Sequence, residues 1–226
     1  SLGDGRILVN NCIYNNFNEI YRILSINDKK MTSLISFPMT SENVAEPTGK
    51  RPVGGYDRII LLKPFDDTIY TLDDKNKVLP LLYVEHKGML VDDKYYKNHV
   101  VFSVATTYSE MSQKGYFSGF VSVFESERHL LLCTYNDVYF LIDKDTNTGL
   151  PLRQTACDEY EGVPLINVVA SDSENLIGFW SPGDFVDKYN LEIMAGSSNE
   201  AVQNLISTLK ELPEDGNPCL IVYHLK

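Results

Sequence analysis

The segment RIILLKPFDDTIYTLDDKNKVLPLLYVE, residues 58–85, is the part of this sequence that most directly predicts a fold. It contains three short apolar runs that are separated by turn-forming residues. A middle strand is predicted over Thr68–Leu72, because a pair of aspartates stands on each side of it and aspartate favours turns. The next strand is predicted over Val78–Glu85, after a hairpin loop at residues 74–77. The segment therefore predicts three consecutive short strands that belong to a blade of an antiparallel β-propeller.

Similar strand-like runs recur along the rest of the chain. The groups repeat about every 50 residues, which is the spacing of four-stranded propeller blades. We therefore predict an all-β chain: a single β-propeller domain over residues 1–226, with about four antiparallel blades that form a partial ring. The further predicted strands are Arg6–Cys12, Glu19–Ile26, Met31–Phe37, Val100–Thr107, Tyr116–Phe124, Arg128–Tyr135, Val138–Asp143, Leu165–Ala170, Leu176–Ser181 and Cys219–Leu225.

One helix is predicted near the C-terminal end of the sequence. Ser197 and Glu200 have the spacing of a capping box, with Ser197 as the N-cap. Apolar residues between Ala201 and Leu209 follow at helical spacing, and Pro213 ends the run. This pattern predicts a peripheral helix that packs one apolar face against the sheets.

Charge and hydropathy exclude several classes of partner. The chain has 31 acidic and 20 basic residues and a net charge of −11, and no basic stripe interrupts the acidic background. Such a chain repels a phosphate backbone, so nucleic-acid binding is not expected. No apolar run reaches the roughly 20 residues that a membrane-spanning helix needs. We therefore expect no transmembrane segment.

The four cysteines do not form a metal-binding pattern. They are scattered, without a CxxC spacing or a neighbouring histidine that would complete a ligand set. Cys133 and Cys219 lie inside apolar runs, so we expect buried free thiols there.

Several phrases of the sequence resemble a known family. They are FDDTIYTLDDKNKVLPLLYVE (65–85), DDKYYKN (92–98), DKDTNTG (143–149) and NPCLIVYHLK (217–226). Together they resemble the six-bladed β-propeller family that is common in Bacteroides-type bacteria. The resemblance implies that this chain is the C-terminal portion of a typical member and lacks N-terminal blades. It also implies a cell-envelope location, at the periplasm or outer-membrane surface, through a lipoprotein anchor on that missing portion. No catalytic residue carries over from the family.

One turn has the composition of a calcium loop. Asp143, Asp145 and Asn147 alternate along the chain, as oxygen ligands do in Ca²⁺ loops. Position 12 of such a loop would be Gln154, which lacks the charge of the usual glutamate. An ordinary polar hairpin turn explains the same residues, so both interpretations stay open.

Aromatic residues near turns are the candidates for ligand contacts. Tyr56, Tyr116 and Trp180 could line a glycan or peptide site at a propeller face, because sugar rings and peptide groups stack on aromatic side chains. The alternative is that these residues belong to the core.

The leading functional hypothesis is a non-catalytic binding or scaffold module, whose ligand is a glycan, a peptide or a partner protein. The alternative is a glycan-active hydrolase or lyase that uses a carboxylate pair in the propeller channel. The acidic cluster at Asp158, Glu159 and Glu161 is better explained by a solvated loop than by catalytic carboxylates. A third hypothesis is self-association through open strand edges.

Overall fold

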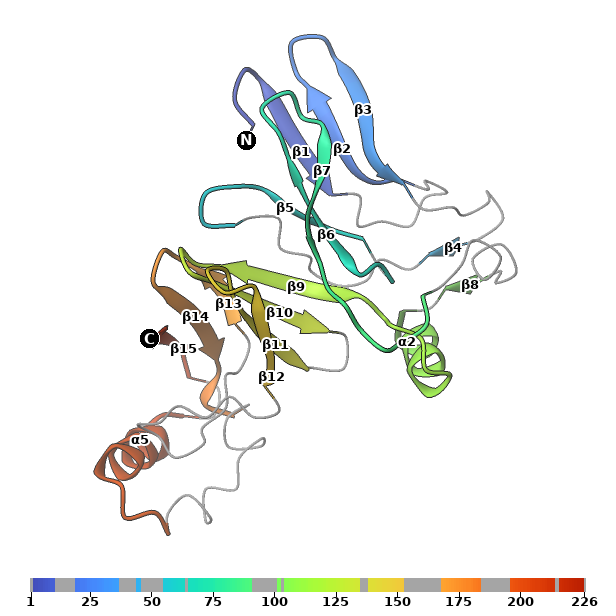
Figure 1. Cartoon of the computed structure of the whole chain (residues 1–226). Coiled ribbons are helices and arrows are strands. Elements are labelled where there is room, and N and C mark those ends of the chain that lie inside the picture. Colours follow the sequence, from blue (N-terminus) through green and yellow to red (C-terminus); the bar gives the residue numbers. More distant parts are fainter. Residues whose placement is uncertain are drawn as a thin grey trace. The chain divides into compact units, whose positions relative to one another are not determined.

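The computed structural model is mostly β (Figure 1). It describes residues 2–10, 19–36, 44–45, 55–63, 65–90, 101–102, 104–134, 138–152, 168–183, 196–213 and 216–225. Within these ranges the strands form four antiparallel sheets and one two-stranded parallel pair. The chain divides into two compact units, residues 1–123 with 132–137 and residues 124–131 with 138–226, which we describe separately.

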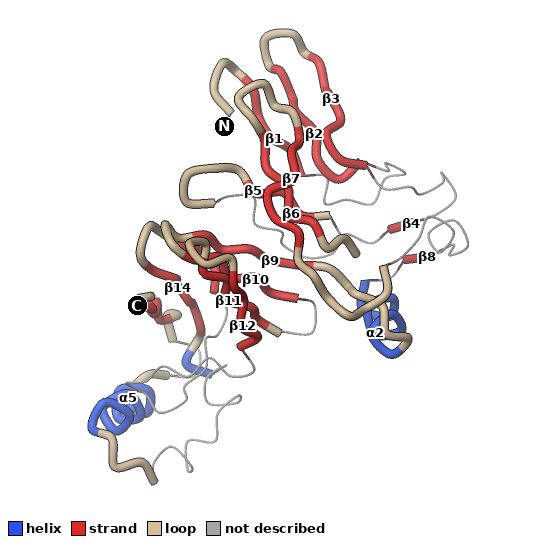
Figure 2. Tube along the Cα trace, in the orientation of Figure 1, coloured by secondary structure: helices blue, strands red, loops and turns tan. Residues whose placement is uncertain are grey.

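The first unit holds two three-stranded antiparallel meanders, whose strands are red in Figure 2. The first meander is β1 (Arg6–Asn10), β2 (Glu19–Ser25) and β3 (Lys30–Ser36), and the second is β5 (Ile60–Leu62), β6 (Thr68–Leu72) and β7 (Val78–Tyr83). The parallel pair is β4 (Val44–Ala45) with β8 (Val101–Phe102).

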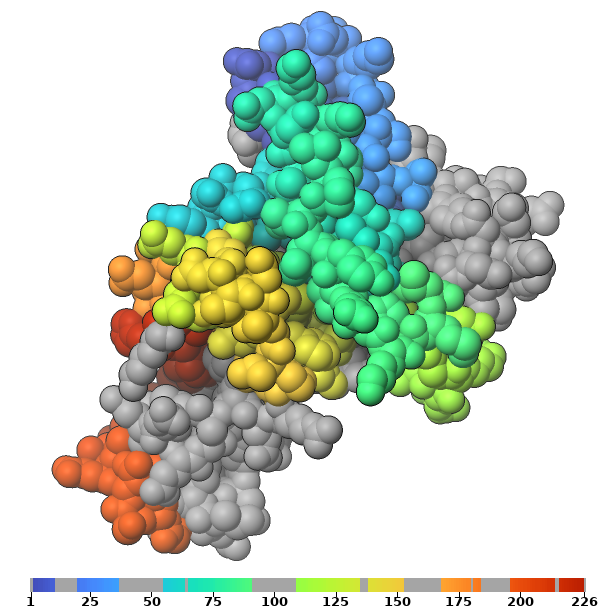
Figure 3. Space-filling view, in the orientation of Figure 1, coloured from blue at the N-terminus to red at the C-terminus, as the bar shows by residue number. Residues whose placement is uncertain are grey.

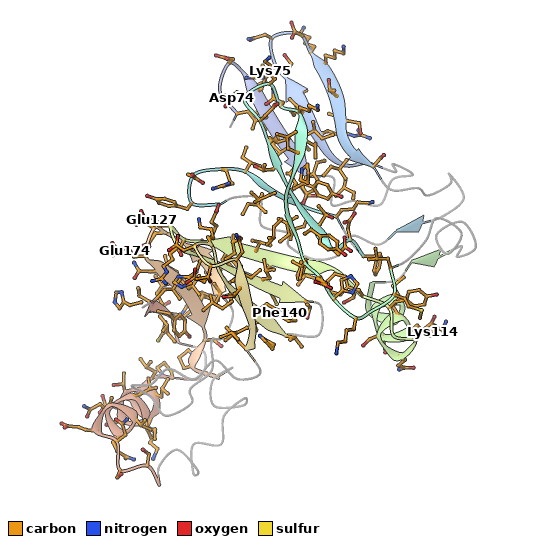
Figure 4. All side chains as sticks on the ribbon, in the orientation of Figure 1. Asp74, Lys75, Lys114, Glu127, Phe140 and Glu174 are labelled. Carbon is orange, nitrogen blue, oxygen red and sulfur yellow. The ribbon has the colours of Figure 1, made fainter. Side chains whose placement is uncertain are left out.

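Strands β5, β6 and β7 confirm the three consecutive strands and the hairpin predicted from residues 58–85. One carboxylate oxygen of Asp73 accepts hydrogen bonds from the backbone amides of Lys75 (2.9 Å) and Lys77 (2.7 Å). Asn76 adopts a positive φ of 61°, which asparagine tolerates better than most residues. The tip of this hairpin carries Asp74 and Lys75 in Figure 4. The turn residues thus set the register of the two strands.

A four-stranded meander and a three-stranded sheet make up the remaining strands. The meander has the order β12-β11-β10-β9, and the other sheet has the order β13-β14-β15. Their bounds are β9 (Phe120–Glu125), β10 (His129–Thr134), β11 (Tyr139–Asp143), β12 (Thr148–Leu152), β13 (Val168–Ser171), β14 (Asn175–Trp180) and β15 (Cys219–His224).

Each unit has its own apolar core. In the first unit Ile20, Tyr21, Ile35 and Leu61 form a buried cluster, and the Tyr21 hydroxyl accepts a hydrogen bond from the Leu62 amide at 3.3 Å. In the second unit the buried cluster contains Phe124, Leu131, Val168 and Leu176. Each fully buried aliphatic side chain of this kind contributes about 1.5–3 kcal/mol to stability.

The C-terminal helix is confirmed, but its predicted N-cap is wrong. Helix α5 spans Glu200–Glu211, and the Asn199 side chain caps it by accepting a hydrogen bond from the Ala201 amide at 2.9 Å. The hydroxyl of Ser197 instead accepts from the Asn199 amide at 3.0 Å. A side chain caps the helix that begins directly after it, and this helix begins three residues beyond Ser197.

The prediction of a single helix is also wrong. Helix α2 (Val104–Gln113) takes up residues 104–107, half of the segment Val100–Thr107 that the sequence pattern assigns to a strand, and within that segment β8 (Val101–Phe102) is a strand. A short apolar, β-branched run does not distinguish a strand from a helix, and here the helix continues into the polar residues that follow. Met111, in this continuation, is fully buried.

Two strand boundaries differ for local reasons. Strand β9 begins at Phe120 rather than Tyr116, because Gly119 has a φ of +77°, which is not a strand conformation. Strand β12 was not predicted, since its Pro151 argues against a strand interior. The structure places this strand at the end of its sheet, where the missing amide of proline is tolerated.

Candidate functional site

The strongest candidate site in the first unit is built on the two aspartates that precede β6. Asp67 is 5% exposed, and one of its carboxylate oxygens accepts a hydrogen bond from the Thr68 hydroxyl at 3.1 Å. Its other oxygen lies 3.5 Å from Nε2 of His86. A histidine and a buried carboxylate therefore face each other across the β6–β7 hairpin. We call Asp66, Asp67, Tyr70, His86 and Phe117 the Asp67 group.

The ring of His86 is held by an aromatic neighbour. It stacks on Phe117 with ring centroids 4.0 Å apart and an interplanar angle of 20°, and Phe117 in turn meets Phe120 edge-on at 5.3 Å. Nδ1 of His86 is buried and has no hydrogen-bond partner in the described part of the chain. A neutral imidazole carries its proton on one nitrogen and accepts with the other. With its proton on Nε2, facing Asp67, the imidazole has Nδ1 as a buried acceptor.

The carboxylate of Asp66, the neighbour of Asp67, contacts residues close to it in the sequence. One of its oxygens accepts from the Thr68 amide at 2.9 Å, and the other accepts from the Tyr70 hydroxyl and the Lys63 ammonium, each at 3.1 Å. Burial raises the pKa of Tyr70, and the charge of Asp66 raises it further. Tyr70 therefore stays protonated and keeps donating to Asp66, which fixes the turn before β6.

A close backbone approach also positions this turn. A side chain at Gly119 would place its Cβ 2.7 Å from the Phe65 amide nitrogen, so only glycine fits there without a shift. Phe65 itself has a positive φ of 58°, and its amide donates to the Ser118 carbonyl at 3.3 Å. The segment that leads into β9 thus holds the turn that carries Asp66 and Asp67.

A second polar cluster lies in the other unit, at the hairpin ends of its sheets. Glu125 is 1% exposed, and its carboxylate accepts from the Lys144 ammonium at 3.1 Å. The same ammonium donates to the Ser126 carbonyl at 2.8 Å. We call Glu125, Ser126, Arg128, Asp143 and Lys144 the Glu125 group.

Three hairpin turns meet at this cluster. The Ser171 hydroxyl donates to the Glu125 carbonyl at 2.9 Å, and the Glu127 amide donates to the Ser173 carbonyl at 2.8 Å. Figure 4 shows Glu127 and Glu174 close together at the tips of two of these hairpins. The contacts join the turn between β9 and β10 to the turn between β13 and β14.

The candidate calcium ligands lie in the turn between β11 and β12. One oxygen of Asp143 accepts from the amides of Asp145 (2.9 Å) and Thr146 (3.0 Å), and the other accepts from the Arg128 guanidinium at 2.8 Å. The Thr146 amide and the Arg128 side chain lower the pKa of Asp143. Arg128 also lies 3.4 Å from the Asp145 carboxylate, and Asn147 has a φ of 53°. The guanidinium therefore pairs with the Asp143 carboxylate and lies near that of Asp145, and Ca²⁺ binding there stays a prediction.

The candidate ligand-binding aromatics are distributed over the two units. Tyr56 is 47% exposed, whereas Tyr116 is half-buried and its amide donates to the Met111 carbonyl at 2.9 Å. Both belong to the first unit, and Trp180 ends β14 in the second. The side chain of Trp180 and the acidic segment with Asp158, Glu159 and Glu161 lie outside the described residues.

The predicted thiols are described at two positions. Cys133 is a buried free thiol, as predicted, and Cys219 is free but only partly buried. Among the described residues, no three histidine, cysteine, aspartate or glutamate side chains form a group able to hold a metal ion.

The pairing of Asp67 with His86 was not predicted from the sequence. The signal for it lies in the hairpin register, since Thr68 pairs with Tyr83 and the Val84 amide donates to the Asp67 carbonyl at 3.0 Å. Extending the predicted hairpin by one pair places Asp67 beside Val84, two residues before His86. Its detection requires the register, which strand patterns alone do not give.

Comparisons with models of known protein families, with curated proteins and with solved structures find no match for this chain. In the described part of the chain, no helix is long and apolar enough to cross a membrane.

Proposed function

We propose that this chain is a non-catalytic binding or scaffold module built on propeller-like blades. Support for the blade architecture comes from the order of the strands, because each of the four antiparallel sheets follows the chain as a meander. A propeller ring is a rigid scaffold whose loops are free to vary and to bind. The family resemblance of the sequence adds a six-bladed ring and a lipoprotein anchor in the cell envelope to this proposal.

The observation that carries the binding proposal is that acidic side chains in the described turns accept hydrogen bonds from backbone amides of the same turns. Four aspartates accept hydrogen bonds from backbone amides of their own turns, and these are Asp66, Asp73, Asp143 and Asp172. Such contacts satisfy amides that would otherwise lack a partner, and they rigidify the hairpins. Carboxylates that make such hydrogen bonds stabilise a rigid scaffold. Exposed loop residues are then the side chains left to contact a ligand.

Glycans and peptides are the proposed ligands, with Tyr56, Tyr116 and Trp180 as the proposed contacts. The test is binding to glycan and peptide arrays by the wild type and by Tyr56→Ala. A matched control is Tyr83→Ala, because Tyr83 is also exposed (63%) but lies within β7 rather than in a loop. We expect the loop variant alone to weaken binding. Equal binding by all three proteins would remove Tyr56 from the site.

An enzyme is the second candidate, because His86 faces Asp67 and keeps one nitrogen without a hydrogen-bond partner among the described residues. This pair favours a glycan-active hydrolase or lyase, in which the histidine exchanges a proton with the substrate. Bond cleavage by the wild type that is lost in His86→Gln would support this candidate. Retention of the activity in that variant would remove the histidine from the mechanism.

A further inference from the structure

The outer strands of the sheets differ in how they are protected against pairing with another chain. A strand at the edge of a sheet presents unpaired backbone groups, and natural proteins often place proline or charge there. Strand β7 contains Pro80 and a register irregularity opposite it, and β12 contains Pro151. Strand β15, with the sequence CLIVYH, contains neither proline nor an acidic or basic residue other than His224.

The free side of β15 follows from its bonding to β14. The Leu225 amide donates to the Glu174 carbonyl at 3.2 Å, which continues the antiparallel register in which Asn175 pairs with His224. In such a ladder alternate residues bond to the same neighbour. The backbone groups of Ile221 and Tyr223 therefore point toward β14. Those of Leu220, Val222 and His224 point toward the open edge, where the described structure has no further strand.

The side chains at these same positions are exposed. Leu220 is 70% exposed and Val222 is 51% exposed, while Phe179, which pairs with Leu220 across the sheet, is 40% exposed. Exposed apolar side chains on an unprotected strand are a recognised cause of association.

We propose that β15 pairs antiparallel with β15 of a second copy of this chain, about a two-fold axis at Val222. Val222 then faces Val222 of the partner subunit, and Leu220 faces His224 of the partner subunit. Because alternate residues of each strand point outward, this register joins three residue pairs by about six backbone hydrogen bonds. The interface is isologous, so a single strand supplies both halves.

The charge pattern favours a second copy as the occupant of this edge. The chain carries a net charge of −11, so two copies repel each other wherever acidic surfaces meet. Strand β15 has no carboxylate, and like charges therefore do not face each other across the proposed ladder. The strand is also rich in residues with a high strand propensity and free of proline and glycine, which is the composition that favours pairing between identical segments.

Molar mass measured across a concentration series tests the proposal. We expect the molar mass of the wild type to rise with concentration, from the monomer value of 25.6 kDa toward about twice that mass. Leu220→Lys should associate more weakly than the wild type at every concentration, because it replaces an exposed apolar side chain of the proposed interface by a lysine that faces His224 of the partner subunit. The matched control is Leu150→Lys, since Leu150 is also 70% exposed but lies on the proline-containing β12, which belongs to the yellow segment at the surface in Figure 3. This control should associate as the wild type does.

Other outcomes would overturn the proposal. A wild type that is monomeric throughout, or equal association of Leu220→Lys and the wild type, would exclude pairing through β15. A second variant, Val222→Pro, removes an amide that points to the open edge while it keeps those that bond to β14. A folded Val222→Pro that still dimerises would also exclude it. Protection of β15 amides from exchange that appears only on addition of another polypeptide would assign the edge to a different partner.

Discussion

The Asp67 group and the Glu125 group place a buried carboxylate against a basic side chain at a hairpin end, but they differ in the base. Lys144 donates both to Glu125 and to the Ser126 carbonyl, so its ammonium is coordinated on two sides. His86 faces Asp67 with one nitrogen only, and its other nitrogen has no hydrogen-bond partner in the described structure.

The difference indicates two kinds of polar contact in one β-rich chain. An ammonium has three donors, whereas a neutral imidazole donates with one nitrogen and accepts with the other. Lys144 therefore joins the Glu125 carboxylate to the backbone of the turn between β9 and β10. His86 is held by its contact with Asp67 and by its stacking on Phe117.

Removal of Lys144 should cause the largest loss of stability. In Lys144→Ala the carboxylate of Glu125 stays buried without its cation, which costs about 3 kcal/mol of unfolding free energy. The measurement is urea denaturation. The control is the double variant Glu125→Gln with Lys144→Met, which removes both charges and should recover most of the loss. A loss below about 1 kcal/mol in the single variant would mean that the ion pair contributes little.

Substitution of Gly119 should destabilise the turn that carries the Asp67 group. Gly119→Ala places a Cβ 2.7 Å from the Phe65 amide nitrogen at a φ of +77°, and we expect a loss of about 2–3 kcal/mol. Gly115→Ala is the matched control, because Gly115 has a φ of +78° but nothing within 4 Å of its Cβ. It should lose only about 1 kcal/mol, the cost of the backbone conformation. Equal losses would show that the close contact is relieved by a small shift.

Isosteric neutralisation of the two carboxylates compares the groups directly. Glu125→Gln leaves the Lys144 ammonium beside a neutral amide, and we expect a loss of about 2 kcal/mol. Asp67→Asn keeps an oxygen for the Thr68 hydroxyl and places a neutral amide beside Nε2 of His86, so the loss should be about 1 kcal/mol. Thermal and urea unfolding of both variants measure the difference. A larger loss in Asp67→Asn would reverse the proposed order of the two groups.

His129 gives the smallest expected effect, through pH. Burial lowers the pKa of His129 from its ordinary value of 6.5, so the unfolded chain binds a proton more readily than the folded one. The contribution of His129 is complete above pH 6.5 and is lost as the pH falls below that value. Stability measured between pH 7 and pH 5 should therefore fall less steeply in His129→Gln than in the wild type. Identical slopes of stability against pH in the two proteins would contradict the assignment of this pH dependence to His129.

Strands with clear turn residues were predictable from the sequence, whereas contacts between hairpins were not. Strand β6 is predicted to the residue, because aspartates mark both of its ends. Helix α2 was missed, since its first turns have the composition of a strand. The pairing of Asp67 with His86 depends on the hairpin register and on the stacking of Phe117, which comes from a distant segment. A pattern of strand-forming residues predicts neither of these.

The same limit applies to the candidate binding residues. Tyr56, Tyr116 and Trp180 were chosen for their positions near turns, and the described structure distributes them over two units. In contrast, the aspartates of the turn at residues 143–147 were correctly placed in a hairpin. Their cationic partner, Arg128, comes from the preceding hairpin and is not indicated by local spacing.

The most direct test of the binding proposal is to measure ligand retention and ligand integrity in one experiment. The purified chain is incubated with glycan and peptide libraries, and the bound and free fractions are analysed by mass spectrometry. We predict that the ligands retained by the wild type and by Asp67→Asn are recovered intact from both proteins. Cleaved products that form with the wild type and disappear with Asp67→Asn would contradict the proposal and identify the chain as an enzyme.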